Sequence, residues 1–133
     1  MAQVRGAPRR RAEPEVEALL DLARQSFIRV QAAWDAADLH ALASFTTEPL
    51  LEDLRTQLAE RGPCPNRTEV LELDARLLGI EELRNEAMIA RVEFSGLIRE
   101  HAAAHATPFR ELWMLAKLSN REAWQLAQVQ SLS

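Results

Sequence analysis

Two runs of alternating apolar and charged residues constrain the fold more than any other feature of this sequence. In the first run, residues 70–80, the apolar positions are Leu71, Leu73, Ala75 and Leu77. In the second run, residues 87–99, they are Met88, Ala90, Val92 and Phe94. Because side chains alternate faces along a strand, a period of two predicts one buried and one exposed face. Gly79 and the polar residues 81–86 separate the runs, which predicts a connection between antiparallel neighbours.

The sequence before these runs predicts three helices. A long first helix is expected from about Pro14, because apolar residues recur every three or four positions, as on one helix face. These residues are Val16, Leu20, Ala23, Phe27, Val30 and Trp34. Asp38 is suited to cap a short second helix, and Thr47 followed by Pro49 is suited to begin a third. Gly62, which precedes a proline, predicts where the third helix ends.

Two further strands are predicted after the alternating runs. Residues 109–118 are apolar on both faces around Trp113 and Leu115, which is typical of a central strand or of one facing a partner. Residues 123–130 place glutamines between apolar residues and predict a fourth strand. Helices followed by an antiparallel meander predict an α+β fold, with three N-terminal helices packed on a curved four-stranded antiparallel sheet. Such an arrangement is expected to leave a cone with a pocket at its open end.

Charge is unevenly distributed along the 133 residues, which are enough for one domain with a substantial core. The only charged residues among the first twelve are Arg5, Arg9, Arg10 and Arg11. A net charge of −4 for the whole chain therefore leaves −8 on the remainder. Residues 1–13 are predicted to be a disordered basic arm, either a solubilising leader or a segment beside a membrane, and residues 14–131 a single domain. A nucleic-acid ligand is not expected, because the predicted folded part is acidic.

No cofactor or metal is expected from the remaining residue types. His101 and His105 are four positions apart, but Pro108 predicts a loop there and no cysteine or carboxylate completes a ligand set. Cys64 is the only cysteine and is interpreted as a loop thiol, because nothing near it in sequence would lower its pKa. No apolar run approaches the roughly 18 residues of a spanning helix, so the chain as given is expected to be soluble.

An ordered set of segments resembles the bacterial branch of the Tim44-like family, named for the forty-four-kilodalton subunit of the mitochondrial inner-membrane translocase. The segments are residues 27–35, 38–39, 45–48, 65–70, 73–80, 94–100, 108–113 and 124–127. The resemblance implies a nuclear-transport-factor-two-like cone and a peripheral membrane scaffold that contacts anionic lipid and tethers an import chaperone. We therefore expect a non-catalytic domain that binds protein, anionic lipid or both. Its expected location is the bacterial inner membrane, either peripheral or anchored by a segment outside this chain.

Two surfaces are candidates for binding. A pocket in the cone is predicted from the first helix and the facing sheet, with plain core packing as the alternative. Its residues are Phe27, Val30, Trp34, Leu71, Leu73, Val92 and Phe94. A partner surface, including a homodimer formed through the sheet, is predicted from Leu112, Trp113, Met114 and Leu115 on the third strand.

The alternative function is a small-molecule enzyme, because the same superfamily includes isomerases and hydrolases with carboxylates inside the cone. Such a site requires an acid or base in an apolar pocket. Glu111 is the best candidate, since it shares a predicted strand face with Phe109 and Trp113. An ion pair with Arg91 or Arg110 is the structural alternative for this side chain. We expect no catalytic residue.

Overall fold

The computed structural model describes residues 13–62, 67–100, 105–119 and 123–132. Across these residues the helices are α1 (Glu13–Asp35), α2 (Leu39–Ala43) and α3 (Glu48–Arg61). The strands are β1 (Glu69–Glu82), β2 (Met88–Arg99), β3 (Thr107–Lys117) and β4 (Gln125–Ser131), with a short 3-10 turn at Arg84–Glu86. Each strand pairs antiparallel with the next in the order β1-β2-β3-β4, which confirms the predicted α+β meander. Residues 1–12 of the predicted basic arm, Cys64 and His101 lie outside the described residues, whereas Glu13 belongs to α1.

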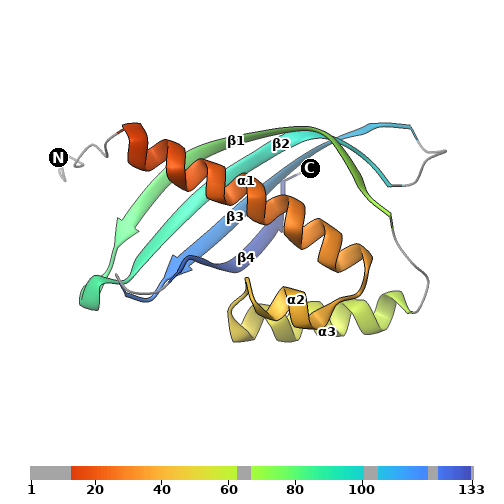
Figure 1. Ribbon diagram of the computed structural model, residues 1–133, viewed down its shortest axis with the longest axis horizontal. Coiled ribbons are helices and arrows are strands. Elements are labelled where there is room, and N and C mark those ends of the chain that lie inside the picture. Colours follow the sequence, from red (N-terminus) through yellow and green to blue (C-terminus); the bar gives the residue numbers. More distant parts are fainter. Residues whose placement is uncertain (1–12, 63–66, 101–104, 120–122, 133) are drawn as a thin grey trace.

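Figure 1 shows α1 crossing one face of the sheet, with α2 and α3 gathered near the end where α1 finishes. The predicted apolar stripe of α1 faces the sheet, and Ala23, Phe27 and Val30 are all buried. Asp38 caps α2 as predicted, because its Oδ1 accepts a hydrogen bond from the Ala41 N–H at 3.0 Å. Thr47 stands at the N-cap position of α3, but its side chain makes no capping hydrogen bond, so that part of the prediction is wrong.

Strand β1 differs from its predicted pattern at two bulges. Its register with β2 shifts once between Val70 and Glu72 and again between Leu77 and Gly79. Each bulge adds one unpaired residue and exchanges the two faces of the strand. Leu71 and Leu78 occupy these positions and are 40% and 49% exposed. Gly79 therefore lies within β1 rather than in the predicted connection.

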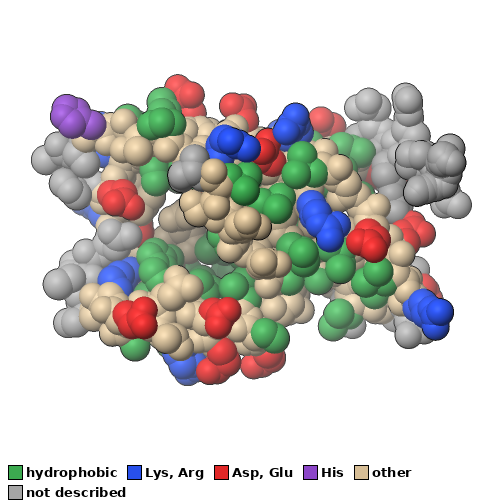
Figure 2. Space-filling view, turned by 180° about the vertical axis from the view of Figure 1, so that it is seen from behind, with side chains coloured by type: hydrophobic (Ala, Val, Ile, Leu, Met, Phe, Trp, Pro, Cys, Tyr) green, Lys and Arg blue, Asp and Glu red, His purple; other side chains and the backbone are tan. Residues whose placement is uncertain are grey.

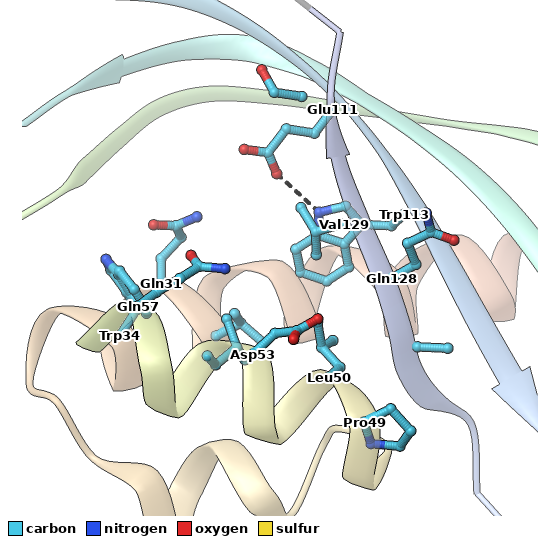
Figure 3. A pocket seen from close by; sticks show the side chains of 14 residues that line it. Gln31, Trp34, Pro49, Leu50, Asp53, Gln57, Glu111, Trp113, Gln128 and Val129 are labelled. Carbon is cyan, nitrogen blue, oxygen red and sulfur yellow. Dashed lines mark hydrogen bonds between the residues drawn. The ribbon is translucent and has the colours of Figure 1, made fainter. Parts of the chain in front are cut away.

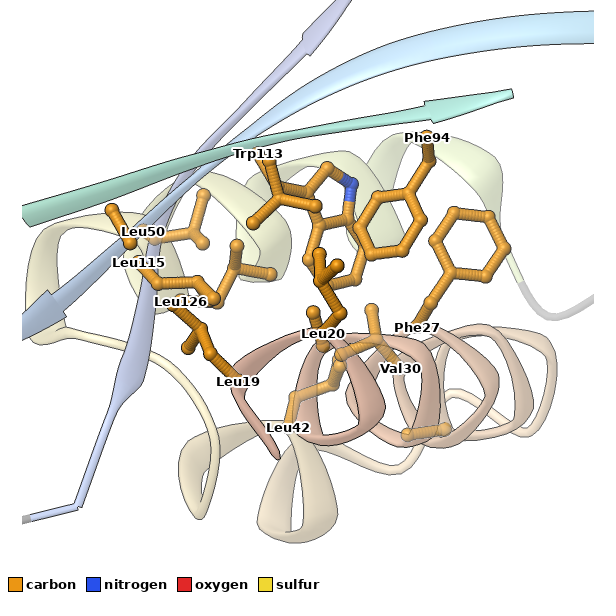
Figure 4. Close-up of a cluster of buried hydrophobic side chains, with 14 of the residues drawn as sticks. Leu19, Leu20, Phe27, Val30, Leu42, Leu50, Phe94, Trp113, Leu115 and Leu126 are labelled. Atoms are coloured by element: carbon orange, nitrogen blue, oxygen red, sulfur yellow. The ribbon is translucent and has the colours of Figure 1, made fainter. Parts of the chain in front are cut away.

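Phe27 projects from α1 into the buried core beside Phe94 (Figure 4). Its ring centroid lies 4.8 Å from that of Phe94, 5.4 Å from that of Phe109 and 5.2 Å from that of Trp113. Leu19, Leu42, Leu115 and Leu126 belong to the same buried cluster. Such aromatic packing buries large apolar areas and adds to stability beyond the area alone. The core therefore fixes the position of α1 on the sheet.

The sheet face away from the helices carries a charged network. Glu93 on β2 accepts hydrogen bonds from Arg76 on β1 at 2.9 Å and from Arg110 on β3 at 3.1 Å. The bond from Arg110 is the main reason that the pKa of Glu93 lies below its ordinary value; Arg76 lowers it further, and burial acts in the opposite direction. Glu93 is consequently ionised at neutral pH, and the network links three neighbouring strands.

Candidate functional site

A cavity of about 660 Å³ lies between the C-terminal half of α1, α3 and strands β3 and β4 (Figure 3). From behind, a hollow is visible between the strands and α3 (Figure 2). The apolar side chains that line the cavity include Val30, Trp34, Leu50, Leu54, Trp113 and Val129. The polar ones include Gln31, Asp53, Gln57, Glu111, Gln128 and Ser131. The site is therefore an apolar chamber with polar groups placed around it, as is typical of ligand sites.

Helical and strand periodicity brings these residues together. Positions 50, 53, 54 and 57 of α3 lie on one helix face, because residues three and four apart are neighbours on a helix. Glu111 and Trp113 are two apart on β3 and therefore face the same side of the sheet. Val129 pairs directly with Trp113 across the β3–β4 ladder. The cavity is thus built by three separate parts of the chain.

Arg61 at the end of α3 fixes the position of Trp34. Its Nη1 donates a hydrogen bond to the Trp34 carbonyl oxygen at 2.7 Å. Its guanidinium carbon also lies 5.4 Å from the centre of the Trp34 ring, a cation–π arrangement. These two contacts join the ends of α1 and α3 and hold one wall of the cavity in place.

Glu111 is half-buried at the cavity and accepts a hydrogen bond from the indole Nε1 of Trp113 at 2.9 Å (Figure 3). The alternative of an ion pair with Arg91 or Arg110 is wrong, since Arg91 pairs with Glu81 and Arg110 with Glu93. Asp53 supplies a second carboxylate from α3. The described residues that line the cavity include no lysine or arginine, so the site has a negative character.

The predicted pocket residues divide into three groups. Val30 and Trp34 line the cavity. Phe27, Val92 and Phe94 are at most 1% exposed and fill the core instead, and Leu73 is half-buried against it. Leu71 is exposed because of the bulge, and Val70 packs against the core in its place. The structure therefore corrects the predicted pocket at five of its seven residues.

The predicted partner surface is corrected at two of its four residues. Trp113 and Leu115 are 1% and 3% exposed and face the helices, so neither is available to a partner on the open face of the sheet. Leu112 and Met114 alternate with them and lie half-buried on that open face. One apolar face of β3 therefore packs on the helices, while Leu112 and Met114 remain half-buried on the other face.

Sequence reasoning missed the contribution of α3 and β4 to the cavity. The spacing of Leu50, Asp53, Leu54 and Gln57 was a local signal for a shared helix face, but it did not indicate what that face would meet. Val129 reaches the cavity because the β3–β4 register shifts after Leu126, which leaves Ala127 as an additional residue. No pattern in the sequence predicts that shift.

Two other hollows adjoin α1. One of about 310 Å³ lies beside its N-terminal half, and one of about 560 Å³ lies between its C-terminal half and the start of β1. Within the described ranges, no group of three or more His, Cys, Asp and Glu side chains is placed to hold a metal ion. Of the helices that the structure describes, none is both long and apolar enough to cross a membrane.

Comparison with known proteins identifies the family. No curated protein matches the sequence. The intermembrane space region of the chloroplast protein ARC6 is similar in structure, with a TM-score of 0.58 and 11% identity over 95% of this chain and 99% of that one. A ketosteroid isomerase-like protein from Erwinia carotovora gives a TM-score of 0.45 and 16% identity over 86% and 96%. The family model for the Tim44-like domain matches residues 2–131. The chain therefore belongs to the Tim44-like domain family.

Proposed function

We propose that this domain is a non-catalytic binding module that associates with a membrane surface and holds an apolar group of a protein or lipid partner. The observation that carries the proposal is the cavity of about 660 Å³, whose walls include six large apolar side chains. Its volume is in the range of pockets that enclose small ligands or side chains. In this proposal the cavity is the open end of the cone that the sequence predicts, and the family membership supports a scaffold role.

The polar groups of the cavity support binding rather than catalysis. General acid–base catalysis requires a group positioned to exchange a proton with the substrate. Glu111 accepts a hydrogen bond from the Trp113 indole at 2.9 Å, which holds this side chain against the cavity wall. Asp53 is exposed on α3. In the proposed role these two carboxylates orient a partner and do not transfer protons.

Narrowing the cavity is expected to weaken the binding of apolar molecules. Ala127→Leu adds a larger side chain at the half-buried lining position between Leu126 and Gln128. Extra methylenes in a filled site cost about 1–3 kcal/mol, so the affinity for the neutral dye Nile red should fall by about tenfold. A fluorescence titration measures this, with Ala43→Leu as the control because Ala43 is exposed on α2 away from the cavity. Equal affinities for both variants, or no binding by the parent, would refute the proposal for the cavity.

Membrane association is expected to depend on the four N-terminal arginines. Each basic residue near an anionic leaflet contributes about 1 kcal/mol, whereas the remaining chain carries a charge of −8 and is repelled. Replacing all four arginines by serine should therefore lower the partition coefficient for phosphatidylglycerol vesicles by about a thousandfold at low salt. Co-flotation with the vesicles measures this coefficient. Phosphatidylcholine vesicles are the control, and neither protein should bind them. If the parent protein does not float with anionic vesicles, membrane association through this arm is excluded.

A further inference from the structure

Strand β4 is an edge strand whose outer edge is only partly covered. Leu126 is the covered position: its N–H donates to the Phe45 carbonyl at 2.6 Å, and its own carbonyl accepts from the Thr47 N–H at 2.9 Å. These bonds form an isolated parallel bridge to the connection between α2 and α3. Beyond Leu126 the edge runs along the cavity, because residues 127, 128, 129 and 131 all line it. The cavity therefore opens beside the outer edge of β4, which includes Val129.

The backbone of Val129 faces this outer edge. The Leu132 N–H donates to the Arg110 carbonyl at 2.9 Å, so the backbone groups of Leu132 point toward β3. Backbone groups alternate sides along a strand, and Val129 is three residues earlier, so its N–H and C=O point away from β3. Across the described part of the chain, no residue bonds these two groups. The Val129 side chain is 39% exposed and lines the cavity.

The charge of the cavity defines what would be complementary to it. Glu111 approaches the cavity from β3 and Asp53 from α3 (Figure 3). Neither carboxylate forms an ion pair with a described residue. An anionic headgroup placed here would be repelled, whereas an ammonium or guanidinium group would be attracted.

We infer that the occupant of the cavity is an extended segment of a partner protein that pairs with the edge of β4 at Val129 as a fifth strand. One apolar side chain of the segment enters the cavity, and a lysine or arginine of the segment meets Glu111 and Asp53. This rests on the proposed function and specifies its partner class. Strand addition takes affinity from main-chain hydrogen bonds and specificity from alternate side chains. An acyl chain would cover the Val129 N–H and C=O without satisfying them, which disfavours lipid at this edge.

The test uses a fluorescein-labelled short peptide with the repeat serine–lysine–serine–valine, called the lysine–valine peptide, because residues two apart share one face of a strand and both side chains can then face the cavity. Two matched peptides accompany it: one has N-methyl groups along a single edge of its backbone, and the other has glutamate in place of lysine. Fluorescence anisotropy should show that the lysine–valine peptide binds and that each matched peptide binds at least about tenfold more weakly. N-methylation removes the N–H donors and keeps every side chain, so it isolates the strand pairing.

Substitutions in the protein test the same contacts as the changes in the peptide. Val129→Pro removes an N–H that points outward, which an edge strand tolerates, whereas Val129→Ala keeps it. The proline variant should bind the lysine–valine peptide about fivefold more weakly than the alanine variant, with an unchanged melting temperature. A double variant, Asp53→Asn with Glu111→Gln, should lose about tenfold in affinity for the lysine peptide and gain affinity for the glutamate peptide.

Each outcome decides between the alternatives. Equal binding of the N-methylated and unmodified peptides would overturn strand addition, even if the proline variant fails to fold. Binding of Nile red in the cavity with no peptide bound would overturn this inference and leave the proposed function standing. Failure of both probes would overturn both. Self-association that Val129→Pro abolishes, measured by sedimentation, would identify a second copy of this chain as the occupant and would also overturn the inference.

Discussion

Replacing Phe27 with alanine is expected to lower the free energy of unfolding by about 4 kcal/mol. Phe27 is 1% exposed, and its ring packs against Phe94, Phe109 and Trp113. Truncation leaves a hole that three large rings border, and such rings collapse into it poorly. The loss therefore includes both the transfer free energy of the phenyl group and the cost of the hole.

Urea denaturation followed by circular dichroism measures this change. Ile28→Ala is the matched control, because Ile28 is the next residue of α1 and is 47% exposed. Its replacement should change the free energy of unfolding by less than about 0.5 kcal/mol. Similar losses for the two variants would mean that α1 does not present the Phe27 face to the sheet. Because Trp113 also forms a wall of the cavity, Phe27→Ala should weaken Nile red binding as well.

Local periodicity was sufficient to predict the elements of this fold. The apolar stripe of α1 has the spacing of one helix face, and the structure buries Ala23, Phe27 and Val30 along it. The helix begins at Glu13, one residue before the predicted start at Pro14. The alternating runs became β1 and β2, and the meander followed from short connections between strands. These features depend on neighbours in sequence, which is why sequence alone reveals them.

The cavity could not be predicted in the same way, because it depends on contacts between distant parts of the chain. Leu71 was expected inside, but a bulge in the β1–β2 ladder exposes it. Trp113 was expected on a partner surface, and only the placement of α1 determines which face of β3 is covered. Leu54 and Val129 were not predicted at the cavity, since α3 and β4 meet only in the folded chain. Bulges and packing partners leave no local periodic signal.

In the proposed function, the distribution of charge separates membrane contact from ligand binding. The four arginines of the arm are complementary to anionic headgroups. Asp53 and Glu111 at the cavity are complementary to a cation and would repel the same headgroups. In the proposed function the arm therefore meets the bilayer, and the cavity meets a basic segment of a partner. Neutralising one of these regions should leave binding at the other unchanged.

Gly96 allows the close approach of the β1 backbone beside the bulge, and Gly96→Ala is expected to cost about 3 kcal/mol of stability. Gly96 on β2 pairs with Leu73, directly after the bulge at Leu71. A Cβ at this position would overlap the Glu72 carbonyl oxygen and would lie 2.7 Å from the Glu72 carbonyl carbon and 3.2 Å from the Leu73 Cα. All three are backbone atoms, so they cannot move aside without breaking the ladder between β1 and β2.

Gly79→Ala is the matched control for Gly96→Ala. Gly79 also lies in a strand next to a bulge, but no heavy atom lies within 4 Å of the place that an alanine Cβ would take there. Its replacement should be neutral or stabilise the protein by at most about 1 kcal/mol, since alanine restricts the unfolded chain more than glycine does. Thermal and urea unfolding of both variants measure the difference. If Gly96→Ala unfolds at the same urea concentration as Gly79→Ala, the close approach of β1 and β2 at Gly96 is wrong.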